Sequence, residues 1–167
     1  MTLALISIGS NRNGPQAQIA HAIELIDEEF SDIRRSALYR TEPVGVVQQD
    51  SFINAAILLE TQFQPLELLK WLLHIENLAG RDRALELPKG PRNLDLDLIL
   101  FGGIRLHSPE LELPHPRFRQ RRFVLQPAAE IAGEMIDPVS GKTIEALLNE
   151  CQDTSWVHVL SMERATA

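Results

Sequence analysis

The stretch that most constrains the fold of this chain runs from Gly90 to Gly102 and reads GPRNLDLDLILFG. A strand over residues 94–101 would alternate its side chains between two faces. One face would then carry only leucines, which are Leu94, Leu96, Leu98 and Leu100. The opposite face would carry Asp95 and Asp97, followed by Ile99 and Phe101. Because an all-leucine face must be buried, we expect this strand inside a sheet with helices behind it.

The two aspartates of this strand are candidates for a cation site. Carboxylates held side by side repel each other unless a positive charge lies between them. Mg²⁺ is the expected ion, since it takes a few carboxylate oxygens together with water and phosphate oxygens. The alternative is that Asp95 and Asp97 form only a solvated strand face. Asp is a poor strand former, and such conflicts with local propensity are typical of functional sites, which favours the metal site.

Length and composition predict a single domain over residues 1–167, because 167 residues with 44% hydrophobic content suffice for one core. A net charge of −7 disfavours nucleic acid or an anionic membrane as the main partner. Thr2 to Ile8 is apolar but short and lacks a basic leader, so we interpret it as a strand and not as an export signal. The single cysteine, Cys151, excludes an intrachain disulfide and fits a reducing cytoplasm.

Arginines are concentrated in the middle and late chain of this acidic protein. They include Arg81, Arg83, Arg92, Arg105, Arg117, Arg119, Arg121 and Arg122. Guanidinium groups suit bidentate phosphate contacts, so this distribution predicts a small phosphorylated ligand. The alternative for residues 117–122 is a solvated helix face.

The apolar periodicity predicts the order strand, helix, strand, strand, helix, strand. The expected ranges are Leu3–Ile8, Pro15–Phe30, Ile33–Arg40, Phe52–Thr61, Pro65 to about Gly80, and Leu94–Phe101. A hairpin through Gly102 and Gly103 to residues 104–106 and a helix near residues 144–149 follow. This order indicates the α+β class, with a ferredoxin-like βαββαβ core and an antiparallel sheet.

Two side chains outside this strand need an interpretation. Glu76 borders the apolar stripe of the second helix, where pairing with Arg81 or Arg83 is one explanation. His115, between two prolines, could be a metal ligand, a buried structural histidine or a positioned phosphate donor, and the rigid setting favours the donor. Between them, residues 79–91 show no periodicity, and a loop of this length in a compact domain is more often functional than accidental.

Several motifs in order resemble a known family. They are IGSN, YRTEPVG, FINAA, GRDR, GPRNLDLDLILFG, LPHPR and RRFVL, spread between about Leu3 and Pro138. Together they resemble the 6-hydroxymethyl-7,8-dihydropterin pyrophosphokinases of folate biosynthesis. The resemblance implies a monomeric enzyme on a three-layer αβα scaffold with C-terminal additions. It also implies transfer of pyrophosphate from ATP to the hydroxymethyl group of a reduced pterin, with two Mg²⁺ ions and release of AMP.

The resemblance also implies roles for individual residues. Asp95 and Asp97 match the ligands of both metal ions, and Arg81 and Arg92 match catalytic positions. The pterin-binding positions are Thr41, Val44, Phe52, Asn54 and Phe123, with the two phenylalanines stacking on the ring. The ATP-binding positions are Glu76, Arg83, Arg92, Leu98, His115 and Arg121. Residues 79–91 match a loop that closes over both substrates.

Two other functions remain open from the residues alone. An Asp-x-Asp pair on a strand also suits a Mg²⁺-dependent nucleotidyltransferase, which would release pyrophosphate instead of AMP. A ferredoxin-like module that binds RNA or a ligand without catalysis would need exposed aromatics and a basic face, whereas this chain has 5% aromatics and a negative net charge.

Overall fold

The fold is an antiparallel sheet with helices, seen in a computed structural model that describes residues 1–43, 48–79 and 93–164. The main strands are β1 (Thr2–Ser10), β2 (Arg34–Arg35), β3 (Ala37–Thr41), β4 (Phe52–Thr61), β5 (Asp95–Phe101) and β8 (Val157–Arg164). They form one sheet in the order β5-β1-β4-β3-β8, and β2 also pairs with β4. All these pairings are antiparallel, which confirms the predicted α+β class with an antiparallel sheet.

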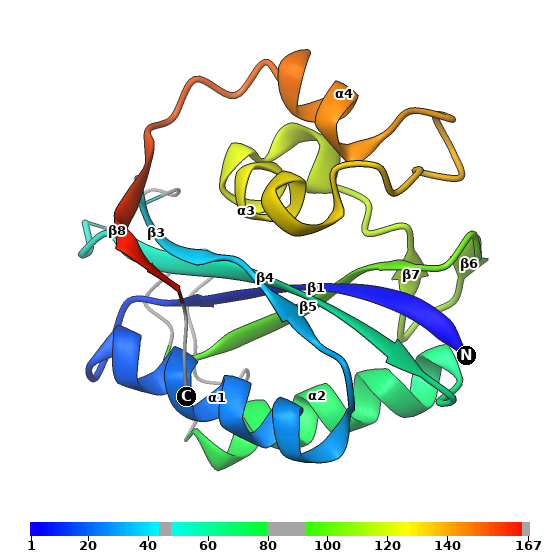
Figure 1. The fold of residues 1–167 in the computed structure, drawn as a ribbon, viewed down its shortest axis with the longest axis horizontal. Helices are drawn as coiled ribbons and strands as arrows, with labels where there is room; N and C mark the ends of the chain where they lie inside the picture. The colour runs from blue at the N-terminus through cyan, green and yellow to red at the C-terminus, as the bar shows by residue number, and fades with distance from the viewer. Residues whose placement is uncertain (44–47, 80–92, 165–167) are drawn as a thin grey trace.

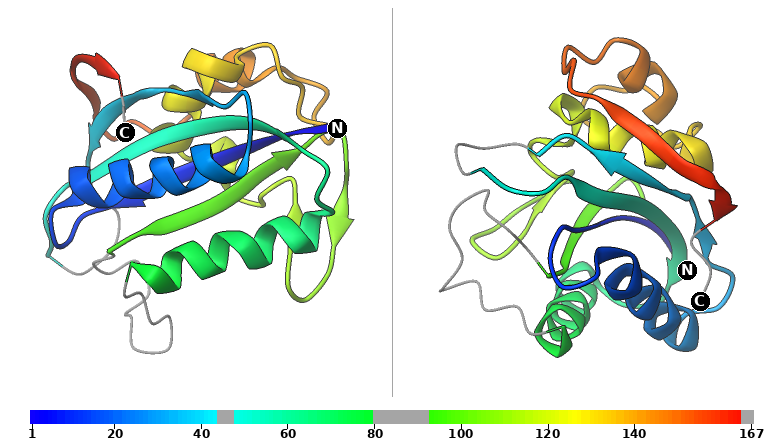
Figure 2. Two further views of the ribbon diagram at one scale, coloured as in Figure 1. Left: turned by 60° about the horizontal axis from the view of Figure 1, so that its bottom comes forward. Right: turned by 90° about the vertical axis from the view of Figure 1, so that its left-hand side faces the viewer.

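Helices cover both faces of the sheet (Figures 1 and 2). Helices α1 (Pro15–Glu29) and α2 (Pro65–Leu78) lie on one face, and α3 (Arg122–Ala132) and α4 (Ile144–Asn149) lie on the other. A short 3₁₀ turn, η1 (Phe118–Gln120), precedes α3. A separate pair of two-residue strands, β6 (Leu106–His107) and β7 (Glu112–Leu113), follows β5.

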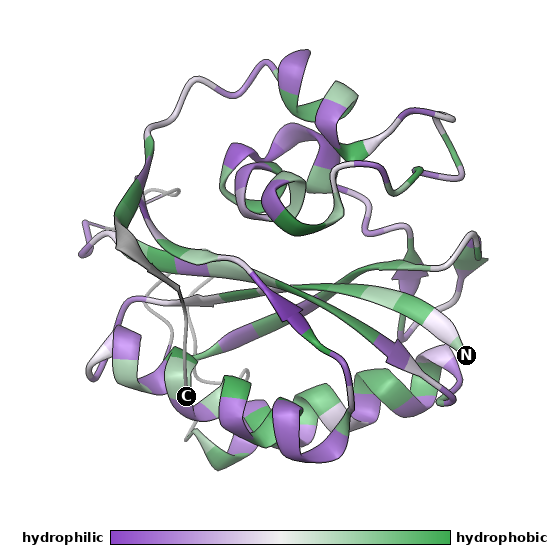
Figure 3. Cartoon of the chain, viewed as in Figure 1, coloured by the Kyte–Doolittle hydropathy of each residue, from purple (hydrophilic) through white to green (hydrophobic). Residues whose placement is uncertain are grey.

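The sheet separates two hydrophobic cores. The first lies against α1 and α2 and includes Ile6, Ile23, Leu72 and Leu98. The second lies against α3 and α4 and includes Leu5, Phe118, Leu125, Ile144 and Leu147. Hydrophobic residues accordingly run along the central strands in Figure 3. Because both faces are buried, the strands can be apolar on both sides, as β1 and β4 are.

Both long helices begin where the sequence predicts. Pro15 and Pro65 occupy the first turn, where a missing backbone N–H costs nothing. Gln64 and Glu67 form a capping box at α2, in which each side chain bonds the other residue's backbone. The helices end at Glu29 and Leu78, one and two residues before the expected ends.

Strand β5 differs from the prediction in two ways. It is an edge strand of the sheet and does not lie inside it, since β1 is its only neighbour among the described strands. The pairing with β1 also shifts register between Leu5 and Ile6, which leaves Ile99 as the extra residue of a β-bulge. Leu100 therefore packs in the α3–α4 core and Phe101 in the α1–α2 core, so the predicted four-leucine face ends at Leu98.

Two other predicted strands are also wrong in detail. The range Ile33–Arg40 is split at Ser36, whose hydroxyl accepts a hydrogen bond from the Ala56 backbone N–H at 2.9 Å in place of a regular ladder bond. Residues 104–106 do not pair with β5, because Leu106 pairs with Leu113 in the small second sheet.

Strand β8 was not predicted at all. Within the described residues no helix combines the length and apolarity that a membrane crossing requires.

Candidate active site

The sheet register aligns two predicted site positions, Asp95 and Asn54, with a glycine between them. Gly9 of β1 lies opposite Asp95 of β5 on one side and opposite Asn54 of β4 on the other. Residues directly opposite in antiparallel strands share a face, so Asp95, Gly9 and Asn54 face the same way. Asp97 and Phe52, two residues along their strands, face that way too. This is the face covered by α3.

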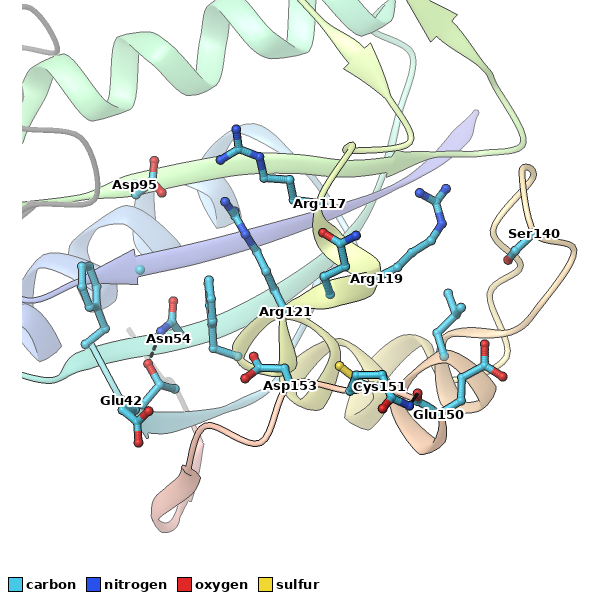
Figure 4. A pocket seen from close by; sticks show the side chains of 17 residues that line it. Glu42, Asn54, Asp95, Arg117, Arg119, Arg121, Ser140, Glu150, Cys151 and Asp153 are labelled. Carbon is cyan, nitrogen blue, oxygen red and sulfur yellow. Dashed lines mark hydrogen bonds between the residues drawn. The ribbon is translucent and has the colours of Figure 1, made fainter. Parts of the chain in front are cut away.

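A pocket of about 750 Å³ lies between this row and α3 (Figure 4). Six of the predicted site residues line it, namely Thr41, Phe52, Asn54, Asp95, Arg121 and Phe123. The pocket thus has an aromatic side chain from β4 and one from α3, with an acidic group at the β5 side. Flat rings gain affinity from such aromatic walls, and the acidic side suits a cation.

The Asn54 amide has a defined orientation in this pocket. Its Nδ2 donates to Thr41 Oγ1 at 2.7 Å, and both residues are buried. Its Oδ1 lies toward Gly9, where a Cβ atom on Gly9 would stand 2.6 Å from it. Because Gly9 has no Cβ atom, the Asn54 carbonyl oxygen can occupy this space. Nδ2 keeps a second N–H besides the one bonded to Thr41, so the amide can offer both an N–H and its oxygen to a ligand in the pocket.

We predict that Gly9→Ala weakens binding of the pterin implied by the sequence resemblance about tenfold, because overpacking of roughly 1–3 kcal/mol displaces the Asn54 amide. Gly103→Ala is the matched control, since nothing lies within 4 Å of its added Cβ. Isothermal titration of both variants with 6-hydroxymethylpterin measures the effect. Equal dissociation constants for the two variants would show that the Gly9 position does not control the amide.

The Asp95 and Asp97 side chains are both half-buried. The strand between them is held by a buried glutamate, Glu76. Glu76 of α2 is 1% exposed, and its Oε2 accepts a hydrogen bond from the Leu96 backbone N–H at 2.8 Å. Glu76 thus anchors the residue that separates the two aspartates, a role that the sequence did not reveal. The side chain of Leu98 packs in the α1–α2 core, so only its backbone could contact a nucleotide.

These two carboxylates fit a magnesium ion that arrives with a phosphorylated ligand. No group of three or more His, Cys, Asp or Glu gathers among the residues that the structure describes. A protein cage of that size is not required, because Mg²⁺ keeps several waters and binds through one or two carboxylates plus phosphate oxygens. Their placement on a hydrogen-bonded strand also fixes the direction of both carboxylates.

His115 is held against the bulge of β5, where its backbone N–H donates to Ile99 O at 2.9 Å. Desolvation by burial, followed by the nearby charge of Arg121, lowers the pKa of His115 to about 4, so the imidazole is neutral at pH 7. Its Nδ1 accepts from the Arg117 backbone N–H at 3.2 Å. This bond assigns the proton to Nε2, which makes His115 a neutral donor, and its donation to a phosphate stays a prediction.

We predict that proton NMR of the ligand-free protein will give His115 a pKa below 5. Since the folded pKa lies below the unfolded value of about 6.5, protonation of His115 favours unfolding as the pH falls through that window. The His115→Asn variant assigns the resonance among the five histidines. A pKa of 6 or above would contradict the burial of this imidazole.

Two of the arginines in residues 117–122, Arg121 and Arg119, make different contacts. Burial lowers the pKa of Arg121, yet its guanidinium stays charged and lies near Asp97 and Asp95, whose charges oppose that shift. Arg119 points away toward the loop that carries Ser140 (Figure 4), and it forms a bidentate ion pair with Asp137 at 2.6 and 2.8 Å. Arg119 thus forms a structural ion pair and also lines the pocket, so it is not simply part of a solvated helix face.

Several predicted positions lie outside the described residues. They are Val44, Arg81, Arg83, Arg92 and the loop that starts after Ala79. The suggested pairing of Glu76 with Arg81 or Arg83 falls there as well. Their roles stay predictions from the sequence.

The pocket also has lining residues that sequence reasoning missed. They include Glu42, Gln120, Ser140, Leu147, Glu150, Cys151, Gln152 and Asp153. Most of them belong to α4 and the segment that follows it, in the part of the chain with the weakest periodicity. The alternation in WVHV was the only available signal, since it indicates the strand to which that segment leads.

Comparisons with known proteins identify the family of this chain. The sequence model of the 7,8-dihydro-6-hydroxymethylpterin-pyrophosphokinase (HPPK) family matches residues 5–133. The 2-amino-4-hydroxy-6-hydroxymethyldihydropteridine pyrophosphokinase of Methylorubrum extorquens is 39% identical over 150 residues, which cover 89% of this chain and 92% of that protein. The protein of the same name from Bacillus subtilis is 37% identical over 135 residues, covering 80% of each chain.

The fold resembles that of solved HPPK-DHPS structures. One from Plasmodium falciparum matches with a TM-score of 0.70 and 16% identity, over 89% of this chain and 42% of that chain. At this identity the match supports the fold alone, and this chain spans about two fifths of the larger protein. From the family match and the two relatives, the chain belongs to the 7,8-dihydro-6-hydroxymethylpterin-pyrophosphokinase family.

Proposed function

We propose that the protein transfers pyrophosphate from ATP to the hydroxymethyl group of 6-hydroxymethyl-7,8-dihydropterin, in folate synthesis. The products are AMP and the pterin diphosphate. The observation that carries this proposal is the single pocket that joins the aromatic walls, the Asn54 amide and the Asp95 carboxylate. Family membership supplies the identity of both substrates.

The pterin ring stacks between Phe52 and Phe123, where a flat uncharged ring gains affinity from both faces. The Asn54 amide hydrogen-bonds the amino-bearing edge of the ring, in an orientation set by the bond from its Nδ2 to Thr41. The row Asn54, Gly9 and Asp95 then directs the other end of the ligand toward β5. The hydroxymethyl group thus faces the acidic side of the pocket, where the phosphates must lie.

Asp95 and Asp97 would hold two Mg²⁺ ions when ATP binds. The chemistry that these ions would supply is positive charge beside the phosphates, which would favour attack at the β-phosphorus. Glu76 keeps the strand between the two aspartates in place through the Leu96 N–H. The Nε2–H of His115 donates to the nucleotide, and Arg121 adds positive charge beside the transferred group.

We also infer finer properties of the protein. The neighbouring strands β5, β1, β4 and β3, with α1 and α2 on one face, support the ferredoxin-like βαββαβ core. A monomeric state and a cytoplasmic location rest on the sequence alone. The sequence motifs assign three arginines to the phosphate site, namely Arg81, Arg83 and Arg92. The motif that contains Val44 assigns that residue to the pterin site.

Incubation with ATP, Mg²⁺ and the reduced hydroxymethyl pterin tests the proposal, with chromatography of the nucleotide products. We expect AMP to form in a one-to-one ratio with the pterin diphosphate, and no AMP when the pterin is omitted. Release of free pyrophosphate with transfer of the nucleotide would indicate a nucleotidyltransferase instead. No reaction, together with RNA retention in a filter-binding assay, would indicate a binding module.

A further inference from the structure

The segment between α4 and β8 forms one side of the pocket. Cys151, Gln152 and Asp153 line it together with Phe52 and Phe123. This segment lies beyond residues 5–133, which the family model covers, so the match assigns it no role. In Figure 4 Asp153 lies on the α3 side of the pocket, near Arg121.

Asp153 joins this segment to the start of α3. Its Oδ2 accepts a hydrogen bond from the backbone N–H of Arg122, the first residue of α3, at 2.9 Å. The first N–H groups of a helix have no partner within the helix, so this carboxylate acts as a cap from a distant part of the chain. The next residue of the helix is Phe123, whose ring is one wall of the pocket.

The same carboxylate shapes the path of the segment toward the sheet. Its Oδ1 accepts from the Ser155 backbone N–H at 2.9 Å and from the Ser155 hydroxyl at 2.7 Å. Burial alone would raise the pKa of Asp153, but these bonds and the one from Arg122 N–H lower it below its ordinary value. Asp153 is therefore ionised at pH 7, where charge strengthens all three hydrogen bonds.

Beyond Ser155 the segment reaches the opposite wall of the pocket. The Trp156 carbonyl accepts from the Glu42 backbone N–H at 3.1 Å, and Val157 pairs with Thr41 in the sheet. Thr41 in turn lies opposite Phe52 in the β3–β4 pairing. A continuous hydrogen-bonded path thus runs from the helix that carries Phe123 to the strands that carry Thr41 and Phe52.

We propose that Asp153 is a positioning residue for the pterin, because it fixes the separation between the Phe123 and Phe52 walls. This inference rests on the proposed function of the pocket. Asp153 itself acts on α3 and on the segment leading to β8, and it need not contact the ligand. Without its carboxylate, the start of α3 loses its only described side-chain cap and can move relative to the sheet.

The expected effect of Asp153→Ala is a selective loss of pterin affinity. We expect the dissociation constant for 6-hydroxymethylpterin to rise roughly tenfold, since stacking on two rings depends on their separation. The dissociation constant for a non-hydrolysable ATP analogue with Mg²⁺ should rise less than that for the pterin. Of the proposed nucleotide-binding groups among the described residues, only Arg121 adjoins the start of α3, whereas Asp95 and Asp97 lie on β5. The KM for the pterin should rise more than kcat falls.

Two further variants separate positioning from a general loss of stability. Asp153→Asn should recover only part of the affinity, because its single carbonyl oxygen can accept from the Arg122 N–H while its NH2 group cannot accept from Ser155. Thr143→Ala is the matched control, since it removes the cap of α4, where Thr143 Oγ1 accepts from the Ala146 N–H at 3.1 Å. All titrations are made well below the melting transitions, so that the folded protein is compared in every case.

The outcomes distinguish this inference from the proposed function. If the unaltered protein does not bind the pterin, the proposed function itself is wrong. If it binds, and Asp153→Ala has the same pterin affinity as Thr143→Ala, Asp153 is not a positioning residue. An equal loss of pterin and ATP-analogue affinity would also overturn the inference, because it would indicate general damage to the site.

Discussion

Replacing Asp95 or Asp97 by Asn is expected to lower the turnover number on the order of a hundredfold or more. Each carboxylate supplies negative charge that an amide of the same size cannot supply to Mg²⁺. The folded structure should be retained, because both side chains are only half-buried and project from the strand face opposite Leu96 and Leu98. The loss should therefore appear in kcat and in the Mg²⁺ dependence, and little in the melting temperature.

Steady-state assays at saturating ATP and pterin measure this effect. Asp27→Asn is the matched control, since Asp27 is exposed on α1 and belongs to the helix face away from the sheet. That variant should keep the activity of the unaltered protein. Turnover that stays within about threefold for both Asp95→Asn and Asp97→Asn would mean that neither carboxylate provides the electrostatic stabilisation assigned to it.

The Asp137→Ala variant is expected to lose about 3 kcal/mol of unfolding free energy. Asp137 is fully buried, accepts two hydrogen bonds from Arg119, and also accepts from the Val139 N–H and the Ser140 hydroxyl. Removing the carboxylate leaves the partly buried Arg119 guanidinium and the Val139 and Ser140 donors without their acceptor. Because native domains are stable by only about 5–15 kcal/mol, this single change removes a large share of the total.

The Asp137 carboxylate should also make the free energy of unfolding depend on pH. Burial alone would raise the pKa of Asp137, but hydrogen bonds from Arg119, Ser140 and Val139 lower it well below its ordinary value. A folded pKa below the unfolded value of about 3.9 gives a contribution that is fully present above pH 4 to 5. That contribution is lost as the pH falls below about 4, toward the folded pKa.

Denaturant unfolding between pH 7 and pH 2.5 measures both effects. The difference in unfolding free energy between the unaltered protein and Asp137→Ala should be constant near neutral pH and should shrink in acid. Glu150→Ala breaks the exposed Lys142–Glu150 ion pair and should cost less than about 1 kcal/mol. Similar losses for the two variants at pH 7 would contradict the structural role of the Arg119–Asp137 pair.

Much of the fold followed from local patterns in the sequence. The proline-started helices at Pro15 and Pro65 and the strand Phe52–Thr61 were predicted because periodicity and start signals agree there. The acidic pair could be predicted because Asp at alternate positions of an apolar strand conflicts with strand propensity. Phe52, Asn54 and Phe123 could not be placed by periodicity, and the resemblance of the motifs supplied them.

The bulge at Ile99 could not be predicted from β5 alone. Strict alternation assigns Leu100 to the face of Leu98, and only the pairing with β1 shows where that alternation breaks. The break matters for the site, because the Ile99 carbonyl accepts the His115 backbone N–H and holds that histidine near β5. Bulges often redirect side chains in this way near functional sites.

The late chain was the least predictable part for a related reason. Asp137 and Asp153 act through partners 18 and 31 residues away in sequence, Arg119 and Arg122. No local spacing pattern links such pairs, and the residues around both aspartates show only the pattern that is typical of a loop. Strand β8 likewise gains its place from pairing with β3, and not from a long apolar run of its own.

A crystal structure with Mg²⁺, a non-hydrolysable ATP analogue and the pterin tests the central claim most directly. It would show where the metal and the nucleotide lie relative to the acidic pair, and where the pterin lies relative to the aromatic walls. We expect both carboxylates, Asp95 and Asp97, to coordinate Mg²⁺ beside the phosphates of the nucleotide. The pterin should lie between Phe52 and Phe123 with its hydroxymethyl oxygen toward the β-phosphorus. Carboxylates that point away from the nucleotide, or a pterin bound outside the aromatic walls, would contradict the proposed mechanism.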